Sequence, residues 1–390
     1  MKMSKKLLAA ALSLSLVFGL TACAPKAPEV EATPTPDAVV TPPTDVTPMK
    51  IAIITSPNTV DDGSFNEDNY NGILSFIAAR GNVDTVTPVQ ETTGDPAAAV
   101  QAVTDIVADY DVLVCTGFQF AGIATVAAEN PDKKFVLVDS FPADAEGQTI
   151  EVPNVYAMQF AEQESGFFAG VAAALETKTG KVAVVNGVAY PSNVNYQFGF
   201  TSGVNYAVKN LGAKAECVEL PSYGGTDVTG AAVGGNYTGN FGDEAMGKVV
   251  GQALIGKGCD IIFVAAGASG NGVFTAAKEA GNVQVIGCDV DQYNDGANGD
   301  KNIILTSGLK NMAVNVERQL NAVADGSFKG GNVTLFADTD STGYVSAEGR
   351  QQLSAETLKT LADLYPMVKD KTIQPAANFS ETTPDAFPGL

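Results

Sequence analysis

A short polar segment, Thr59 to Asp68 (TVDDGSFNED), contains the first residues of the chain that could bind a small polar ligand. Ser64 and Glu67 have the spacing of a capping box, which predicts a helix whose N-cap is Ser64. Phe65 and Asn66 then lie in the first turn, where Phe65 offers a flat apolar face and Asn66 offers a hydrogen-bond donor and acceptor. The alternative is that Phe65 packs into the core beside the helix N-terminus.

Residues for several common kinds of catalysis are missing. The sequence contains no histidine, which excludes Ser-His-Asp and Cys-His catalysis and the usual zinc sites. Apart from Cys23, the cysteines are Cys115, Cys217, Cys259 and Cys288, and they lack the paired spacing of a metal site. Most of them lie in or beside apolar runs, so we predict buried free thiols. The formal net charge of −21 opposes binding to nucleic acid or to an anionic membrane surface.

Short apolar runs of strand length alternate with amphipathic segments. The runs include KIAIIT, DVLVCTG, KFVLVDS, NVYAMQF, KVAVVNG, CDIIFVAAG, VQVIGCDVD and NIILTSG. Between them the apolar residues have helical spacing, as at Tyr70, Ile73, Leu74 and Ile77. This alternation predicts an α/β fold with parallel sheets covered on both faces. Ligands of such sheets bind beyond the carboxyl ends of the strands, so polar residues just after a strand are the candidates for binding.

The segment before residue 49 is predicted to direct and anchor the protein. Residues 1–22 have the basic start, apolar centre and small residues of a secretory signal peptide. The residues LTAC, 20–23, resemble a bacterial lipobox, in which Cys23 becomes lipidated; the alternative is an ordinary signal peptide with an incidental cysteine. Residues 23–48 are rich in proline, threonine and acids, so they are predicted to form an extended tether to the membrane.

Seven segments, taken in order, carry a resemblance to a known family. They are DDGSFNEDNYNG, PDKKFVLVD, QFAEQESGFFAGVAAALETKTGKVAVVNG, GNFGDEAMGK, AAGASGNGVFTAAKE, VIGCDVDQ and ILTSGLKNMAV. They are spread over nearly the whole of residues 50–320 and are similar to the basic membrane lipoprotein family, the purine-nucleoside-receptor type of substrate-binding protein that serves ABC importers. The resemblance implies a type I periplasmic-binding-protein fold, in which two doubly wound parallel-sheet lobes, joined by three crossovers, close on a nucleoside.

The resemblance also implies an organisation and partners. We expect residues 49–157 and about 290–325 to form the N-terminal lobe, and residues 158–289 and about 326–390 to form the C-terminal lobe. The expected protein is a monomeric lipoprotein on the extracytoplasmic face of a bacterial cell membrane. It would capture purine nucleosides in the cleft between the lobes and pass them to an ABC permease and its ATPase. No cofactor, metal or catalytic activity is expected.

For the base of the nucleoside, the resemblance points to three residues. Phe65 would stack on one face of the base, and Asn66 would bind its edge. Asp139, at the end of KFVLVD, would accept hydrogen bonds from the base. The alternative for Asp139 is to cap the turn that follows the strand.

For the ribose, the resemblance points to Gly267 in AAGASGNG, to Asp289 in VIGCDVDQ and to Lys310 in TSGLK. Free backbone amides near Gly267 would meet hydroxyl groups, and Asp289 would bridge two of them. The alternatives are that Gly267 only permits a tight turn and that Lys310 is a surface cation.

The chain departs from the family pattern at NYQFGF, where Tyr196 occupies the position of a phenylalanine and Phe198 is added. Tyr196 is therefore the predicted second stacking wall, with Phe198 or Phe200 as alternatives; all three could instead be core aromatics of a helix. A second departure is the long glycine-rich stretch PSYGGTDVTGAAVGGNYTGN, which could reshape the rim of the cleft.

Two other functions remain open. The acids of DVDQYNDG, residues 289–296, are spaced similarly to the calcium-binding acids of nucleoside hydrolases. In those enzymes the cluster follows the first strand, whereas here it lies near the end of the chain. The second alternative is a binding protein for a sugar or a signalling furanose that feeds a transporter or a sensor. It would share the fold and most site positions but would lack the pair of stacking aromatics.

Overall fold

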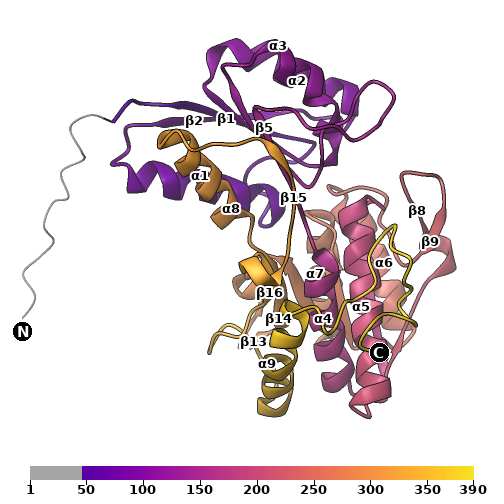
Figure 1. Cartoon of the computed structure of the whole chain (residues 1–390). Helices are drawn as coiled ribbons and strands as arrows, with labels where there is room; N and C mark the ends of the chain where they lie inside the picture. The colour runs from indigo at the N-terminus through magenta and orange to yellow at the C-terminus, as the bar shows by residue number, and fades with distance from the viewer. Residues whose placement is uncertain (1–45) are drawn as a thin grey trace, which may run out of the picture. The chain divides into compact units, whose positions relative to one another are not determined.

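The computed structural model describes residues 46–390 (Figure 1). The predicted signal peptide, the lipidation site Cys23 and most of the predicted tether lie outside the described residues. The described part contains two six-stranded sheets and two short two-stranded sheets. None of its helices is long and apolar enough to cross a membrane.

The first large sheet is parallel throughout, as expected for unbroken apolar strands. In spatial order its strands are β15 (Gly331–Leu335), β5 (Val155–Phe160), β4 (Lys134–Val138), β3 (Val112–Thr116), β1 (Lys50–Thr55) and β2 (Thr85–Gln90). One face is covered by α1 (Phe65–Ala79) and α8 (Met312–Ala324). The other face is covered by α2 (Pro96–Ile106), η2 (Phe118–Ile123) and α3 (Ala124–Glu129), and η1 (Val107–Asp109) follows α2. We call this sheet with its helices the first lobe.

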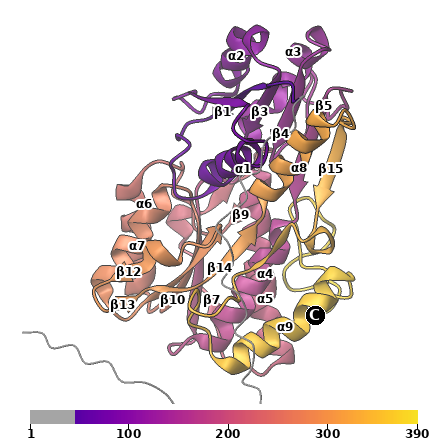
Figure 2. The ribbon, with the colours of Figure 1, turned by 90° about the vertical axis from the view of Figure 1, so that its left-hand side faces the viewer.

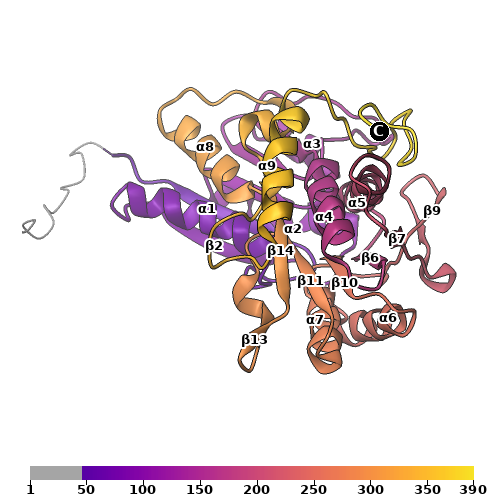
Figure 3. The same ribbon diagram turned by 90° about the horizontal axis from the view of Figure 1, so that it is seen from below.

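The second large sheet is parallel except at one edge, where β14 and β16 are antiparallel. Its strands are β16 (Thr342–Tyr344), β14 (Ile304–Lys310), β11 (Gln284–Asp289), β10 (Ile261–Ala265), β6 (Lys181–Asn186) and β7 (Glu216–Cys217). Helices α4 (Glu162–Glu176), α5 (Pro191–Asn210) and α9 (Ala355–Lys369) cover one face, and α6 (Glu244–Gly256) and α7 (Ser269–Ala280) cover the other (Figure 3). This is the second lobe. Both lobes confirm the predicted α/β class.

The small elements lie in the connections. The hairpin of β8 (Gly225–Thr226) and β9 (Ala232–Gly234) follows η3 (Pro221–Tyr223) and belongs to the glycine-rich stretch that the sequence singled out. A second hairpin, β12 (Ala297–Asn298) and β13 (Lys301–Asn302), follows η4 (Tyr293–Gly296). The turn η5 (Ala337–Thr339) connects β15 to β16.

The chain passes between the two sheets three times, after β5, after β14 and after β15. Helix α8 follows a strand of the second sheet but lies beside α1 of the first lobe (Figure 2). The lobe boundaries predicted at about 290 and 325 differ from this arrangement. Strand β14 pairs in the second sheet rather than the first, and β15 pairs in the first rather than the second. An apolar run predicts a strand, but it does not show with which sheet the strand pairs.

Helices α4 and α5 approach so closely that glycine is required at their contact. A Cβ atom on Gly170 of α4 would lie 2.1 Å from the backbone oxygen of Phe200, and one on Gly203 of α5 would lie 2.1 Å from that of Phe167. Real Cβ atoms do not approach so closely, so larger residues would push the helices apart. The glycines therefore allow the middle parts of α4 and α5 to lie side by side.

Candidate functional site

A cavity lies at the carboxyl ends of strands from both sheets. The empty space in and around it, including the open mouth, is about 650 Å³. Ser56 follows β1, Thr116 ends β3, Ala265 ends β10, and Asp289 ends β11; all four line the cavity. The position agrees with the rule that ligands of open parallel sheets bind beyond the strand ends.

Most of the residues predicted to bind a ligand line this cavity. They are Phe65, Asn66, Asp139, Tyr196, Gly267, Asp289 and Lys310. Their shared feature is that each lies within two residues of a strand end or in the first two turns of the helix that follows a strand.

Phe198 is placed elsewhere, which corrects the expectation for this residue. It packs with Val194 and Tyr237 in a small separate cluster. Two residues turn an α-helix by about 200°, so Phe198 points away from the cavity that Tyr196 faces. Phe200 is fully buried, and its ring stacks on that of Phe263 with the centroids 5.8 Å apart. Neither Phe198 nor Phe200 can serve as a stacking wall in this arrangement.

Tyr196 reaches the cavity, but it does not offer a free ring face. Its side chain is only 2% exposed, and its ring packs edge-on against Phe263 at 5.5 Å between centroids. Lys310 Nζ lies 5.7 Å from the Tyr196 centroid and 4.8 Å from the Phe65 centroid. The Tyr196 hydroxyl donates to Asp289 Oδ1 at 2.7 Å. The added hydroxyl therefore holds a site carboxylate, and the predicted stacking of a base between Phe65 and Tyr196 is not supported.

Three aromatic residues at the cavity were missed by the sequence reasoning. Phe118 comes from the first lobe, whereas Tyr190 and Phe241 come from the second. The ring centroids of Phe118 and Tyr190 are 5.1 Å apart, and those of Tyr190 and Phe241 are 6.0 Å apart. A Cβ atom on Gly187 would lie 2.2 Å from the Phe241 ring, so glycine makes room for that ring. The motif GNFGDEAMGK contained the signal for Phe241, but its aromatic residue was not assigned a role.

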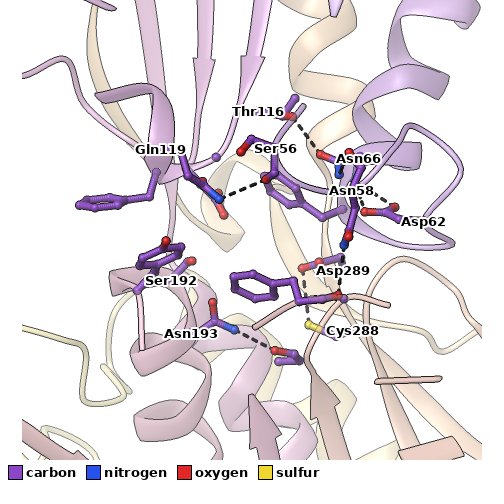
Figure 4. A pocket seen from close by; sticks show the side chains of 18 of the residues that line it. Ser56, Asn58, Asp62, Asn66, Thr116, Gln119, Ser192, Asn193, Cys288 and Asp289 are labelled. Atoms are coloured by element: carbon purple, nitrogen blue, oxygen red, sulfur yellow. Dashed lines mark hydrogen bonds between the residues drawn. The ribbon is translucent and has the colours of Figure 1, made fainter. Parts of the chain in front are cut away.

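Seven polar side chains of the cavity were also missed. They are Ser56, Asn58, Asp62, Thr116, Gln119, Ser192 and Asn193. Gln119 Nε2 donates to the backbone oxygen of Ser56 at 3.1 Å, and Asn193 Nδ2 donates to that of Ala265 at 2.8 Å (Figure 4). A search of every segment that follows a strand would have found Asn58 and Gln119, each three residues after a strand end.

The N-terminus of α1 begins after Ser64 as predicted, but a different side chain caps it. The Asp62 carboxylate accepts from the backbone N–H groups of Ser64, Asn66 and Glu67 at 3.0–3.1 Å. Burial raises the pKa of Asp62 to about 6, although these hydrogen bonds oppose the shift. The Ser64 hydroxyl is thereby free to reach the other lobe, where it donates to Asp289 Oδ2 at 3.2 Å.

Asn66 keeps a donor for a ligand. Its Oδ1 accepts from the Thr116 hydroxyl at 2.9 Å (Figure 4). Its Nδ2 has only a long contact of 3.5 Å, to the backbone oxygen of Asn58. The amide nitrogen carries two hydrogens, so at least one of them is available to a molecule in the cavity.

Asp139 directly follows β4 of the first lobe, and Asp289 ends β11 of the second lobe. Both residues have the same unusual backbone conformation. Their φ angles are +62° and +68°, in the left-handed region that non-glycine residues seldom adopt. This conformation turns the chain sharply at the end of β4 and of β11. Such strained residues concentrate at ligand sites, and here both carboxylates line the cavity.

Lys310 lies at the centre of the charged groups. Its side chain is buried, and its Nζ is 2.6 Å from Asp139 Oδ2, 3.5 Å from Glu162 Oε1 and 3.8 Å from Asp289 Oδ1. Burial opposes the charge on the amine, but the three carboxylates more than compensate, so the pKa of Lys310 is raised. The alternative of a surface cation therefore does not hold, and the ammonium group lies inside the site.

Three carboxyl groups surround the single ammonium group of Lys310, so one positive charge cannot balance all of them when they are ionised. Burial raises the pKa of Asp139, and it raises the pKa of Glu162 to about 7, although Lys310 opposes both shifts. Among the described residues, Asp139 Oδ1 is buried without any hydrogen-bond partner. Buried carboxylate oxygens are nearly always hydrogen-bonded, so this oxygen is an acceptor that a bound molecule can satisfy.

Hydrogen bonds connect the two lobes near the cavity. Besides the bond from Ser64 to Asp289, Asn58 Nδ2 donates to the backbone oxygen of Phe241 at 3.1 Å, and Gln292 Nε2 donates to that of Gly63 at 3.3 Å. The first partner of each pair comes from one lobe and the second from the other. The two lobes are therefore held together around the cavity by the protein's own contacts.

The acids of DVDQYNDG do not converge. Asp289 faces the cavity, whereas Asp291 accepts from Arg350 Nε at 2.6 Å. Within residues 46–390, no group of three or more acidic or cysteine side chains is arranged to hold a metal ion. The cysteines of this part are free thiols, of which Cys115, Cys259 and Cys288 are buried.

Comparisons with known proteins agree with this architecture. The chain is 28% identical over 309 residues to the ABC transporter nucleoside-binding protein BmpA of Lactococcus lactis, covering 74% of this chain and 78% of that protein. It is 27% identical over 336 residues to an uncharacterized lipoprotein of Pyrococcus abyssi, covering 84% and 76%. A crystal structure of a solute-binding protein of an ABC transporter system from Aeropyrum pernix shares the fold, with a TM-score of 0.70 and 22% identity over 86% of this chain and 95% of that one.

A family model described as "ABC transporter substrate-binding protein PnrA-like" matches residues 49–219 and 230–375, which is most of the chain. The unmatched residues between these two ranges include the β8–β9 hairpin's first strand. The chain belongs to the PnrA-like family of ABC transporter substrate-binding proteins.

Proposed function

We propose that this protein captures purine nucleosides in the cavity between its lobes and delivers them to an ABC permease and its ATPase. A lipid on Cys23 would anchor it, as a monomer, at the extracytoplasmic face of the cell membrane. The observation that carries the proposal is that one cavity combines aromatic rings from both lobes with the unpaired, buried Asp139 Oδ1. Aromatic rings suit the faces of a base and contribute roughly 1–3 kcal/mol per stacked base, and the carboxylate oxygen suits a donor on its edge.

The free polar atoms favour 6-oxopurines. Asp139 Oδ1 accepts, and Asn66 Nδ2 donates. Inosine and guanosine present an N1–H donor beside the O6 acceptor, which matches this pair. Adenosine presents the opposite pattern on the same edge, an N1 acceptor beside an amino donor. A mismatched buried group costs about 1–3 kcal/mol, so adenosine should bind roughly tenfold or more weakly than inosine.

The ribose would bind on the side of the cavity where Asp289 lies. Asp289 already accepts from Tyr196 and Ser64. A ribose hydroxyl can replace the Ser64 hydroxyl at Asp289 Oδ2, while Tyr196 continues to hold Oδ1. Gly267 adopts a φ of +53° beside Phe241, which supports its predicted place on this side of the site. These contacts would couple nucleoside binding to the contact between lobes.

The decisive experiment is a binding panel measured by thermal shift and titration calorimetry. Inosine and guanosine should stabilise the protein by about 2.7 kcal/mol at a hundredfold excess over Kd, whereas pentoses, hexoses and pyrimidine nucleosides should do much less. Asp139→Ala should weaken inosine binding at least tenfold, because a charged hydrogen bond is lost. The matched control is Phe198→Leu, outside the cavity, which should leave the affinity unchanged. Stabilisation by sugars but by no nucleoside would show that the assignment is wrong.

The anchor needs a separate test. The native chain expressed in bacteria should fractionate with membranes and incorporate labelled fatty acid, and Cys23→Ser should abolish both. A soluble, unlabelled native protein would contradict the predicted lipidation.

A further inference from the structure

The C-terminal tail, residues 376–390, is an ordered part of the second lobe. It lies beyond residue 375, where the family match ends, and it runs without helix or strand along α5 (Figure 1). Ala376 and Phe387 are buried, and the Phe387 ring packs edge-on against Phe167 of α4 at 6.1 Å between centroids. Asn205 Nδ2 of α5 donates to the backbone oxygen of Pro384 at 3.1 Å. The tail therefore contacts both α4 and α5.

One hydrogen-bonded chain leads from the tail toward the binding cavity. The backbone N–H of Asn378 donates to Asn195 Oδ1 at 2.7 Å, and Asn195 Nδ2 donates to Glu162 Oε2 at 2.9 Å. A backbone N–H can only donate, and an ionised carboxylate can only accept. The orientation of the Asn195 amide is therefore dictated by its two partners.

Glu162 connects this chain to the charged centre of the site. It is the first residue of α4 and is buried, and its Oε1 lies 3.5 Å from Lys310 Nζ. The charged and titratable groups that face it are Lys310 from β14, Asp139 from the end of β4 and the Tyr196 hydroxyl from α5. A hydrogen bond to the ionised carboxylate favours that form over the protonated one. Asn195 thus opposes the tendency of burial to protonate Glu162.

We propose that Asn195 and the backbone N–H of Asn378 form a relay that favours the ionised form of Glu162 beside Lys310, so that the C-terminal tail influences the charge of the binding site. Asn195 does not line the cavity, and it is a positioning residue. Without the tail N–H, its amide can turn over and present oxygen to Glu162, an arrangement that only a protonated carboxyl satisfies. The consequence for nucleoside capture rests on the proposed function, whereas the effect on Glu162 does not.

The primary test follows Glu162 itself in the unliganded protein. Carbon-13 NMR of labelled glutamate carboxyl groups, with the Glu162 signal assigned by its loss in Glu162→Gln, gives the titration midpoint. Asn378→Pro removes the N–H, and Asn195→Leu removes both hydrogen bonds. Each should raise the midpoint by about one to two pH units, the equivalent of a charged hydrogen bond. The matched control is Asn378→Ala, which keeps the N–H and loses a side-chain nitrogen that has no partner; its midpoint should equal that of the wild type.

Unchanged midpoints in both Asn378→Pro and Asn195→Leu would overturn the relay. If Asn378→Pro prevents the tail from folding, Asn195→Leu decides the question by itself. A purely structural role of the tail would lower the melting temperature in these variants without moving the midpoint of Glu162.

The second readout is the affinity for inosine as a function of pH. Asn195→Leu should shift the pH profile of the affinity in the wild-type background and should not shift it in the Glu162→Gln background. A shift that persists without Glu162 would show that Asn195 acts by another route. If the wild type does not bind inosine at any pH, the proposed function fails, and the NMR titration still decides on the relay.

Discussion

Replacing Lys310 with methionine tests whether one buried ammonium group neutralises the acids of the site. Methionine keeps an unbranched apolar side chain, one atom shorter than that of lysine, but carries no charge. Lys310 is 2% exposed, and three carboxylates lie within 3.8 Å of its Nζ, the nearest at 2.6 Å. Removing one partner of a buried ion pair costs about 3–5 kcal/mol, because the other charge remains buried and unpaired. We expect the free energy of unfolding to fall by an amount in this range near pH 8.

The loss should depend on pH in a predictable direction. Burial already raises the pKa of Glu162 to about 7 and also raises that of Asp139, and Lys310 opposes both shifts. Without Lys310 both pKa values rise further. A carboxyl whose pKa is higher in the folded protein stabilises the fold at low pH, and this stability is lost as the pH rises through the folded-state pKa. Each additional proton bound by the folded state changes the free energy of unfolding by about 1.4 kcal/mol per pH unit.

The assay is urea unfolding followed by circular dichroism, because the chain has no tryptophan. The difference between Lys310→Met and the wild type should be smallest near about pH 5 and should grow towards about pH 8. The control is Lys359→Met, which removes an exposed ion pair with Asp363 and should cost at most about 0.5 kcal/mol at either pH. An equal loss at both pH values would refute the reasoning, as would a loss below about 1 kcal/mol at the higher pH.

Three further predictions follow from single contacts. Tyr196→Phe removes the donor to Asp289 Oδ1 and should weaken inosine binding about tenfold by calorimetry; an unchanged affinity would remove the hydroxyl from the site. Gly203→Ala places a Cβ atom 2.1 Å from a backbone oxygen of α4 and should lower the free energy of unfolding, measured by urea denaturation, by about 1–3 kcal/mol. The control is Gly256→Ala, whose Cβ atom would have nothing within 4 Å and which should not lower it. Burial raises the pKa of Glu164 to about 7, so the wild type should lose stability as the pH rises from about 4.5 to 7, and Glu164→Gln should reduce that slope; an unchanged slope would contradict the shift.

The sequence alone determined the class of fold and the places where a ligand could bind. Continuous apolar runs require sheets that are buried on both faces, and burial on both faces requires helices between parallel strands. Ligands of open parallel sheets bind beyond the strand ends, so polar residues just after strands were candidates, and the family resemblance selected Asp139 and Asp289 among them. The helix start that places Phe65 and Asn66 was predicted from the local pattern, and the structure reproduces it at Ser64.

The tertiary structure decided what the side chains in that site do. Tyr196 and Phe198 looked equivalent in sequence, but the rotation of α5 sends one to the cavity and the other away from it. Lys310 meets Asp139 from a position 171 residues away, and nothing local in either segment shows that they pair. Which residues share a buried charge depends on how separate elements pack against one another, and that packing is set by the whole chain rather than by any one of its segments.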